Sequence, residues 1–264
     1  MDLLSLQNRS HAAQLLSREA GLLALHHFRN RDSLKWESKG PQDWVSQADR
    51  TVEEQIRERL LKLFPEDGFL GEESGKHKID SRGIWVVDPI DGTSSFLKGM
   101  PTWCVSLAFL LHDGSIPIGV IYQPCTDELY TTDPGQGARL NGIPMKPSRA
   151  ASMAEGIFGI GHSRRADHLK TQNAVRYVTQ NDGTFETLGS GALMVAYVAC
   201  GRYIGYYDPH IHAWDCLAGI SLVRSVGGWT SDFLADDGLR KGNHLAAAVP
   251  GMEKTLASFL ELIK

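Results

Sequence analysis

Apolar residues recur at helical spacing in two segments near the start of the chain. Positions 13, 16, 20, 23 and 24 are apolar, which predicts an amphipathic helix over about the first thirty residues. A second apolar run has residues four apart from Val52 to Phe64, with Glu and Arg between them, and Pro65 ends it. The pattern therefore predicts two helices before the chain changes character.

Short β-rich runs follow these helices, separated by Gly, Asp and Pro. Such runs predict consecutive strands in a largely antiparallel sheet. They are "IWVV" (84–87), "WCVSLAFLL" (103–111), "IPIGVIY" (116–122) and "ELYTT" (128–132).

Strand and helix patterns alternate from about residue 150. The predicted strands are "GIFGIG" (156–161), "FETLG" (185–189), "YIGYYD" (203–208) and "LAAAV" (245–249). The predicted helices are 168–179, "SGALMVAYVACG" (190–201), "WDCLAGISLVRSVGG" (214–228) and a terminal helix. We expect an α+β (mixed α/β) protein in which helices cover sheets, with a mainly antiparallel half over 1–150 and an alternating half over 151–264. No Pro/Ser-rich or highly charged linker separates the halves in the sequence. Residues 1–264 are therefore predicted to form a single unit.

Composition narrows the kinds of partner. The chain of 264 residues carries a formal net charge of -4 and shows no basic stripe, which argues against nucleic-acid binding. Polar and charged residues interrupt the first 21 residues, so we expect neither a signal peptide nor a membrane partner, and predict a cytoplasmic location. The mild negative charge leaves a small molecule as the expected partner. The 4 cysteines have no short spacing and are predicted to be buried thiols.

Acidic residues lie at the ends of the predicted elements. The run "IWVV" ends in Asp88, and Asp91 follows just before a glycine. Two like charges beside a buried strand repel and raise each other's pKa, and a divalent cation relieves the repulsion. Mg²⁺ prefers oxygen ligands, and the turn also exposes the Ile90 carbonyl. Further acids at element ends are Asp49, Glu72, Glu73 and Asp215; a single acid in such a place is ordinarily a helix cap, and Asp215 also fits that interpretation.

Two glycine-flanked segments suit an anionic substrate. Gly92 and Thr93 offer N–H groups beside the acids, and "GSGALMVAY" (189–197) opens a helix with a hydroxyl-bearing cap. Free N–H donors at helix starts hold phosphate or sugar hydroxyls, although similar caps occur in proteins that bind nothing. His210 and His212 allow a transition-metal site, but the surrounding oxygen donors favour Mg²⁺, Ca²⁺ or Mn²⁺.

Three motifs occur in order, "GEESG" (71–75), "WVVDPIDGTSSF" (85–96) and "WDCLAG" (214–219). Together they resemble the inositol monophosphatase family of Mg²⁺-dependent, lithium-sensitive phosphatases. The similarity extends over nearly the whole chain, including "KGPQDWVSQAD" (39–49) and "GVIYQPCTDELYTTDPGQGARLNG" (119–142). The resemblance implies a layered αβαβα sandwich of the inositol monophosphatase / fructose-1,6-bisphosphatase type, and a homodimer.

The resemblance also implies two to three Mg²⁺ ions per subunit. Glu72, Asp88 and the carbonyl of Ile90 would hold the first ion. Asp88, Asp91 and Asp215 would hold the second, so that Asp88 bridges the two. A looser third ion would lie near Glu72.

The remaining implied roles concern the reaction. Thr93, polarised by Asp49, would act with Glu72 to orient the water that attacks phosphorus. The substrate-binding residues would be Gly92, Thr93, Ser94, Gly189, Ser190, Gly191 and Asp208, and the supporting residues would be Lys39 and Glu73. The implied activity is hydrolysis of a small alcohol phosphate monoester by metal-activated water, with inositol 1-phosphate as the leading substrate.

Two departures from the family pattern leave the alcohol open. Ser94-Ser95-Phe96 follows the Asp-Gly-Thr core where relatives commonly carry Thr-Asn-Phe, and Asp208 stands where animal inositol monophosphatases usually carry Glu. A carboxylate one methylene shorter changes which hydroxyl it reaches. Histidinol phosphate is the closest alternative, followed by fructose 1,6-bisphosphate and 3'-phosphoadenosine 5'-phosphate, although no basic cluster suited to a second phosphate of the latter is evident. A non-catalytic regulatory binding protein is a minor alternative, for which a lost metal ligand would be expected.

Overall fold

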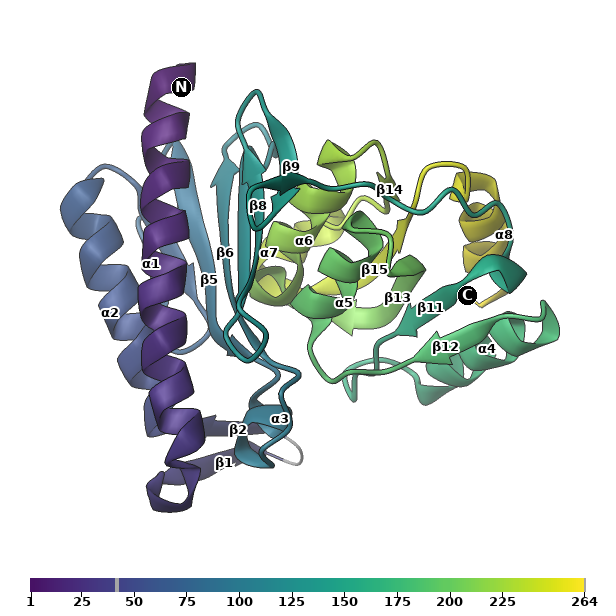
Figure 1. The fold of residues 1–264 in the computed structure, drawn as a ribbon, viewed down its shortest axis with the longest axis horizontal. Coiled ribbons are helices and arrows are strands. Elements are labelled where there is room, and N and C mark those ends of the chain that lie inside the picture. Colours follow the sequence, from purple (N-terminus) through teal and green to yellow (C-terminus); the bar gives the residue numbers. More distant parts are fainter. Residues whose placement is uncertain (41–42, 264) are drawn as a thin grey trace.

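The computed structural model describes the backbone of residues 1–40 and 43–263, with the side chains of all of these except Lys39 and Asp43. Helices and sheets alternate as layers in the order αβαβα, which confirms the predicted sandwich (Figure 1). The outer helices on one side are α1 (Leu3–Arg29) and α2 (Gln47–Leu63), the central helices are α5 (Gly191–Ala199) and α6 (Ala213–Ser225), and those on the other side are α4 (His168–Gln180) and α8 (Glu253–Leu262). No described helix is both long and apolar enough to cross a membrane.

The first sheet has eight strands in the order β10-β9-β8-β7-β6-β5-β3-β4. Every pair is antiparallel except β3 and β5, so the predicted antiparallel first half is confirmed. The strands with strong apolar runs were predicted, whereas the short ones at the two edges were not. The bounds are β3 Gly68–Gly71, β4 Gly75–His77, β5 Gly83–Asp91, β6 Cys104–Leu111, β7 Ile118–Gln123, β8 Glu128–Asp133, β9 Gly137–Leu140 and β10 Ile143–Pro144.

The second sheet has five strands in the order β12-β11-β13-β15-β14. Strand β11 runs parallel to β12 and β13, whereas β15 is antiparallel to β13 and β14. The bounds are β11 Ile157–Ile160, β12 Thr184–Glu186, β13 Tyr203–Ile211, β14 Trp229–Thr230 and β15 Asn243–Ala248. The predicted strand "FETLG" is too long at its end, because Thr187 leaves the ladder and donates its hydroxyl to the Ile160 carbonyl (2.8 Å).

Smaller elements complete the fold. A hairpin of β1 (Trp36–Gly40) and β2 (Asp43–Ser46) lies beside the short helix α3 (Thr93–Leu97), at the end of the molecule where β5 finishes (Figure 1). Helix α7 (Gly238–Lys241) precedes β15, and 3-10 turns cover Arg31–Ser33, Met153–Glu155 and Ala235–Asp237.

Strand β5 is buried on both faces, as its unbroken apolar run requires. Trp85 and Val87 belong to the core under α1 and α2, whereas Ile84 and Val86 belong to the core that includes α5 and α6. Side chains alternate between the faces of a strand, so Asp88 continues the second series. The strand therefore delivers its first carboxylate to the side of the sheet that faces α5 and α6.

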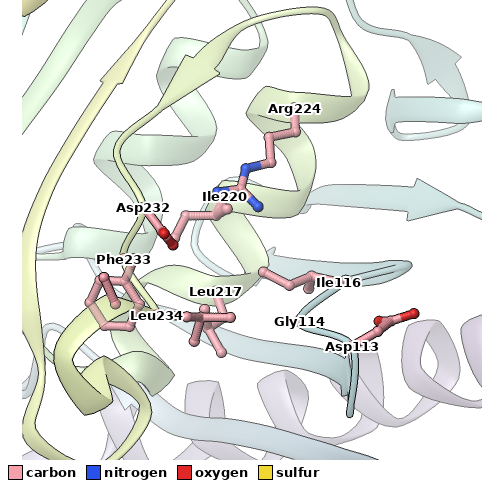
Figure 2. Close-up of a pocket in the computed structure, with 10 residues that line it drawn as sticks. Asp113, Gly114, Ile116, Leu217, Ile220, Arg224, Asp232, Phe233 and Leu234 are labelled. Carbon is pink, nitrogen blue, oxygen red and sulfur yellow. The ribbon is translucent and has the colours of Figure 1, made fainter.

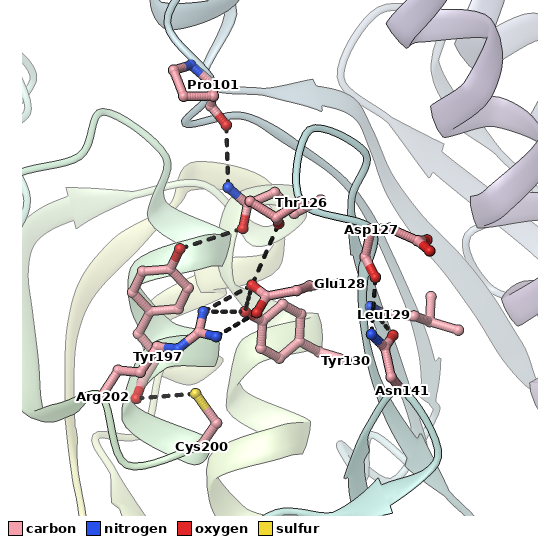
Figure 3. A network of polar contacts seen from close by, with 11 residues as sticks. Pro101, Thr126, Asp127, Glu128, Leu129, Tyr130, Asn141, Tyr197, Cys200 and Arg202 are labelled. Carbon is pink, nitrogen blue, oxygen red and sulfur yellow. Dashed lines mark hydrogen bonds and ion pairs between the residues drawn. The ribbon is translucent and has the colours of Figure 1, made fainter.

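A polar network joins the two halves of the chain (Figure 3). Arg202, just before β13, forms an ion pair with Glu128 of β8 and donates to the Tyr130 hydroxyl (2.8 Å), while Tyr130 donates to Glu128 (2.7 Å). The Tyr197 hydroxyl of α5 lies 3.3 Å from Oε1 of Gln123 in β7. The Arg202 guanidinium holds the pKa of Glu128 below its usual value, so this carboxylate stays charged where it joins the halves.

Candidate active site

An irregularity in β5 brings two acids together. In a regular strand, residues three apart point to opposite faces, which would separate Asp88 from Asp91. The register against β6 shifts between these residues, where Pro89 cannot donate to the ladder. As a result, Asp88, Asp91 and Asp215 each place a carboxylate oxygen within 4.8 Å of the others. The structure thus brings together the acids that the sequence singled out.

Asp215 reaches this acidic cluster (Asp88, Asp91 and Asp215) from the first turn of α6. Its Oδ2 accepts the N–H of His212 (3.2 Å), the residue before the helix. The sequence left open whether Asp215 is a helix cap or a ligand. The structure shows that its carboxylate caps α6 and also joins the cluster.

Asp91 is bound by the start of α5. Its carboxylate accepts hydrogen bonds from the Ser190 hydroxyl (2.5 Å) and from the N–H groups of Ala192 (2.7 Å) and Gly191 (3.3 Å). Ser190 is fully buried and also caps α5, because its Oγ accepts the Leu193 N–H. Ser190 and Gly191 were predicted to contact substrate, but here their donors face Asp91, and only Gly189 of that segment lines the cleft.

The acidic cluster is strongly perturbed. Burial raises the pKa of Asp91 to about 6 and that of Asp215 to about 7. The pKa of Asp88 lies well above its usual value because of burial and then the charges of Glu72 and Asp91. Buried carboxylates in such mutual repulsion are relieved by a cation, and a donor set made only of oxygens fits Mg²⁺.

The hydroxyl of Thr93, the first residue of α3, lies next to the acidic cluster. Oγ1 of Thr93 lies 3.2 Å from the Ile90 carbonyl and 3.5 Å from Oδ1 of Asp49. Asp49 is fully buried in the first turn of α2, where its Oδ2 accepts the N–H of Ser46 (2.7 Å) in a capping box. Burial is the main cause that raises the Asp49 pKa to about 6. The predicted pairing of Thr93 with Asp49 is present at the limit of hydrogen-bond length.

The acids after β3 approach the acidic cluster from another side. Glu72 lines the cleft, and its backbone N–H donates to the Val87 carbonyl of β5 (3.2 Å). The N–H of Glu73 donates to Glu53 of α2 (2.9 Å), which holds the turn in place. The side chain of Lys39, the other predicted supporting residue, lies outside the described part of the chain.

Gly92 is required by the backbone between β5 and α3. Its φ is 96°, in the left-handed region, and a Cβ there would lie 2.8 Å from the Thr102 carbonyl. Gly92, Thr93 and Ser94 all line the cleft, and their contact with substrate stays a prediction.

Asp208 is buried beside the cleft and does not line it. Its carboxylate accepts the Tyr206 hydroxyl (3.0 Å) and the His210 N–H (3.0 Å), and burial raises its pKa to about 6. Both oxygens are therefore engaged within the protein. Its predicted contact with the substrate alcohol stays a prediction.

The cleft has a volume of about 1000 Å³ and includes residues that the sequence analysis did not single out. Two aromatic side chains contribute, Trp44 from the hairpin and Trp214, whose ring stacks on His212 (4.7 Å between ring centres). The others are Gly40, at the end of β1, and four residues between β11 and α4, namely His162, Ser163, Arg164 and Arg165. Two arginines therefore line the cleft, and the adjacent letters "SRR" after a predicted strand were the available signal. The expectation that no basic cluster suits a second phosphate of 3'-phosphoadenosine 5'-phosphate stays a prediction.

The histidines of "HIH" do not form a metal site with the acids in the described residues. His210 lies 3.0 Å from the Lys241 carbonyl through its Nε2, and the grouped metal-type ligands are carboxylates alone. The oxygen-donor interpretation is the one that the geometry favours.

A second cavity of about 360 Å³ lies between the β6–β7 turn, α6 and the segment before α7 (Figure 2). Its floor is apolar, with Ile116, Leu217 and Ile220, and Arg224 and Asp232 stand at its edge. It contains none of the clustered acids, so the larger cleft is the candidate active site.

The αβαβα sandwich and the acidic cluster in its main cleft define a layered α+β protein with a candidate metal site. The model of the inositol monophosphatase family matches residues 5–262, and the chain belongs to that family. The resemblance inferred from the three motifs is thereby confirmed.

Some similar proteins are named as inositol-1-monophosphatases and others as SuhB proteins. An inositol-1-monophosphatase of Rhizobium meliloti (strain 1021) is 40% identical over 217 residues, which cover 81% of each protein. A Nus factor SuhB of Pasteurella multocida (strain Pm70) is 33% identical and covers 93% of this chain and 92% of its own. The crystal structure of extragenic suppressor protein suhB from Bartonella henselae has a TM-score of 0.88 at 33% identity, covering 95% of this chain and 97% of that one.

Proposed function

We propose that this protein is a Mg²⁺-dependent phosphatase that hydrolyses a small alcohol phosphate monoester, with inositol 1-phosphate as the leading substrate. The observation that carries the proposal is the cluster of Asp88, Asp91 and Asp215, whose carboxylate oxygens lie within 4.8 Å of one another beside the Gly92–Thr93 turn. Buried acids with raised pKa values in a cleft are typical of functional sites. Family membership supports the same class of reaction.

The residues that would hold the ions are those of the acidic cluster and its neighbours. Glu72, Asp88 and the Ile90 carbonyl would bind the first ion, and Asp88, Asp91 and Asp215 the second, with a third near Glu72. When bound, Mg²⁺ would supply positive charge that offsets the charge developing on the attacking and leaving oxygens. The hydrogen bonds from α5 to Asp91 and from His212 to Asp215 keep these carboxylates oriented before any ion arrives.

The attacking water would be oriented by Thr93 and Glu72. The Thr93 hydroxyl is within reach of two acceptors, the Ile90 carbonyl and Asp49. When it donates to either of them, its oxygen keeps lone pairs that can accept a hydrogen bond from water. Glu72 lines the same cleft and would accept the other water hydrogen.

Phosphate would be held at the start of α3. The first N–H groups of a helix have no partner within it, so those of Gly92 and Thr93 can donate to phosphate oxygens. Ser94 adds a hydroxyl to the same lining, and Gly189 lies beside α3, where a Cβ would be 3.2 Å from Oγ of Ser95. The alcohol would meet Ser190, Gly191 and Asp208 only after their present hydrogen bonds change.

A turnover screen tests the proposal and ranks the alcohols. Purified protein with Mg²⁺ should release phosphate from inositol 1-phosphate, and millimolar Li⁺ should slow the release. Histidinol phosphate, fructose 1,6-bisphosphate and 3'-phosphoadenosine 5'-phosphate are assayed in parallel. Absence of phosphate release from every one of these compounds would rule out the enzyme proposal.

A regulatory role is a second candidate because a relative covered over 92% of its length is named a Nus factor. The predicted mark of a non-catalytic protein, a missing metal ligand, is not found, since all the implied carboxylates are present. The homodimer and the cytoplasmic location are carried over from the sequence as proposals. Sedimentation analysis of the purified protein measures the first, and fractionation of cells the second.

A further inference from the structure

One loop gives part of the lining of the main cleft a basic character. The loop between β11 and α4 contributes His162, Ser163, Arg164 and Arg165 to the lining, although these residues lie about 70 to 90 positions from the acids after β3 and in β5. The reaction as proposed above uses none of them.

The acidic lining residues come from other elements than the β11–α4 loop. Within the described part of the chain, the acids that line the cleft are Glu72, Asp88, Asp91 and Asp215, each already assigned to hold cations. A cation site neutralises these carboxylates, so they are not the natural partners of a guanidinium across the cleft.

Arg164 is the basic residue whose charge the described structure leaves uncompensated. Its side chain is exposed, and it makes no hydrogen bond or ion pair with any residue that the structure describes. The acid next along the chain is occupied elsewhere, because Asp167 accepts the Leu169 N–H (2.9 Å) at the start of α4 and lies 3.7 Å from His168. The guanidinium therefore keeps its donors for a ligand.

The backbone around Arg164 is fixed by hydrogen bonds. The Gly161 N–H donates to the Tyr207 carbonyl of β13 (2.8 Å), which ties the loop to the second sheet. Buried Ser163 accepts the N–H of Arg165 (3.3 Å) and so shapes the turn that carries Arg164. A fixed backbone limits the freedom that the Arg164 side chain loses when it binds an anion.

The cleft is also larger than a small neutral alcohol phosphate requires. Its volume of about 1000 Å³ lies at the upper end of the range for small-molecule sites, roughly 300 to 1000 Å³. A leaving group that extends from the acidic cluster toward the β11–α4 loop would use this space.

We infer that Arg164 forms a subsite for a second anionic group, so that the preferred substrate is a phosphomonoester whose alcohol also carries a phosphate or a carboxylate. The inference rests on the proposed phosphatase function and specifies its substrate class. Guanidinium pairs with either anion through two parallel N–H donors, which gives direction as well as charge.

Matched substrate pairs test the inference. Fructose 1,6-bisphosphate is compared with fructose 1-phosphate, and 6-phosphogluconate with sorbitol 6-phosphate, so that each pair differs mainly in the second anion. We expect kcat/KM to be about tenfold higher for the doubly anionic member of at least one pair. A factor of about ten corresponds to one charge-assisted hydrogen bond at a partly exposed site. The pair that shows the preference identifies the anion as phosphate or carboxylate.

Variants connect the preference to Arg164. Arg164→Gln should abolish the preference and change kcat/KM for the neutral-alcohol member less than about threefold, whereas Arg164→Lys should keep part of it because the charge remains. Arg176→Gln is the matched control, since Arg176 is exposed on α4 and does not line the cleft. No preference in the wild-type protein, or an equal loss on both members in Arg164→Gln, overturns the inference.

Failure of the two proposals can be distinguished. Turnover of the neutral members without a preference refutes the subsite alone, whereas no turnover of any compound refutes the phosphatase function. In the latter case, calorimetric titration with Mg²⁺ present still tests the subsite. The wild-type protein must then bind fructose 1,6-bisphosphate about tenfold more tightly than fructose 1-phosphate, and Arg164→Gln must not; equal affinities overturn the inference.

Discussion

A single carboxylate, that of Asp91, connects the end of β5 to the start of α5. Three donors from residues 190 to 192 converge on it, which offsets part of the effect of burial on its pKa. The contact explains why a small, hydroxyl-bearing segment opens α5. Ser190 and Gly191 act on the acidic cluster through Asp91, at a separation of about 100 residues that no local pattern reveals.

Asp91→Asn should reduce turnover by more than about 100-fold, because even partners of metal ligands contribute 10- to 100-fold. The variant keeps the side-chain volume but removes the charge, and its amide N–H₂ would face the donors of α5. The circular dichroism spectrum should not change. Steady-state kinetics over a Mg²⁺ titration measures the effect.

Asp32→Asn is the control for this variant, since Asp32 is exposed on a 3-10 turn and does not line the cleft. Asp91→Asn with wild-type turnover at ordinary Mg²⁺ would remove Asp91 from the list of ligands.

Helices and strands whose apolar residues recur at regular spacing could be predicted from the sequence. The register shift that brings Asp88 and Asp91 together could not. The four-residue spacing from Val52 to Phe64 predicted α2, and the run before Asp88 predicted β5. The shift in register between Asp88 and Asp91 depends on pairing with β6, so only the assembled sheet reveals it. The short edge strands were missed because they have too few residues to show a period.

The Gly92 turn between β5 and α3 gives a prediction for an element boundary. Gly92→Ala should lower kcat/KM at least tenfold, because its Cβ would push the Thr102 carbonyl and move the N–H groups proposed to hold phosphate. Backbone strain adds about 1 to 2 kcal/mol to the loss of stability. Activity assays and thermal unfolding measure the two effects.

Gly142→Ala is the control that separates backbone strain from the steric contact of the new Cβ. Gly142 also has a positive φ, of 79°, but no atom lies within 4 Å of its Cβ position. This variant should lose similar stability and keep its activity. If Gly92→Ala behaves in the same way, the geometry of the turn is not needed for activity.

At the scale of the whole molecule, one hydrophobic core includes side chains from both halves, such as Val86 of β5 and Leu217 of α6. The ion pair between Glu128 and Arg202 adds a polar link. We propose on this basis that residues 1–264 unfold as a single unit. Scanning calorimetry should then show one transition, whereas two separated transitions would indicate independent halves.

The same measurement tests how the acidic cluster affects stability. The folded, metal-free protein binds protons more tightly than the unfolded chain does, because burial raises the pKa of Asp91 to about 6 and of Asp215 to about 7. The stability that comes from these raised pKa values is present below about pH 4 and is lost as the pH rises through 6 to 7. Without metal, Tm should therefore fall across this interval.

Mg²⁺ should reverse this loss, since it binds the deprotonated carboxylates. The rise in Tm on adding Mg²⁺ should be larger at pH 8 than at pH 5.5, with about 2 to 4 °C for each kcal/mol. Asp91→Asn should reduce this dependence on pH. A rise that is equal at both pH values, or larger at pH 5.5, would contradict the assignment of these acids as ligands.

The order in which the chain supplies its acids has a consequence during synthesis. Asp88 and Asp91 leave the ribosome more than a hundred residues before Asp215, and β15, at Asn243–Ala248, completes the centre of the second sheet later still. A chain that ends between Asp91 and Asp215 therefore carries two of the clustered acids without the third. Such a product lacks one of the carboxylates proposed to hold metal, so we expect a complete site only after α6 and the strand that follows it have been made.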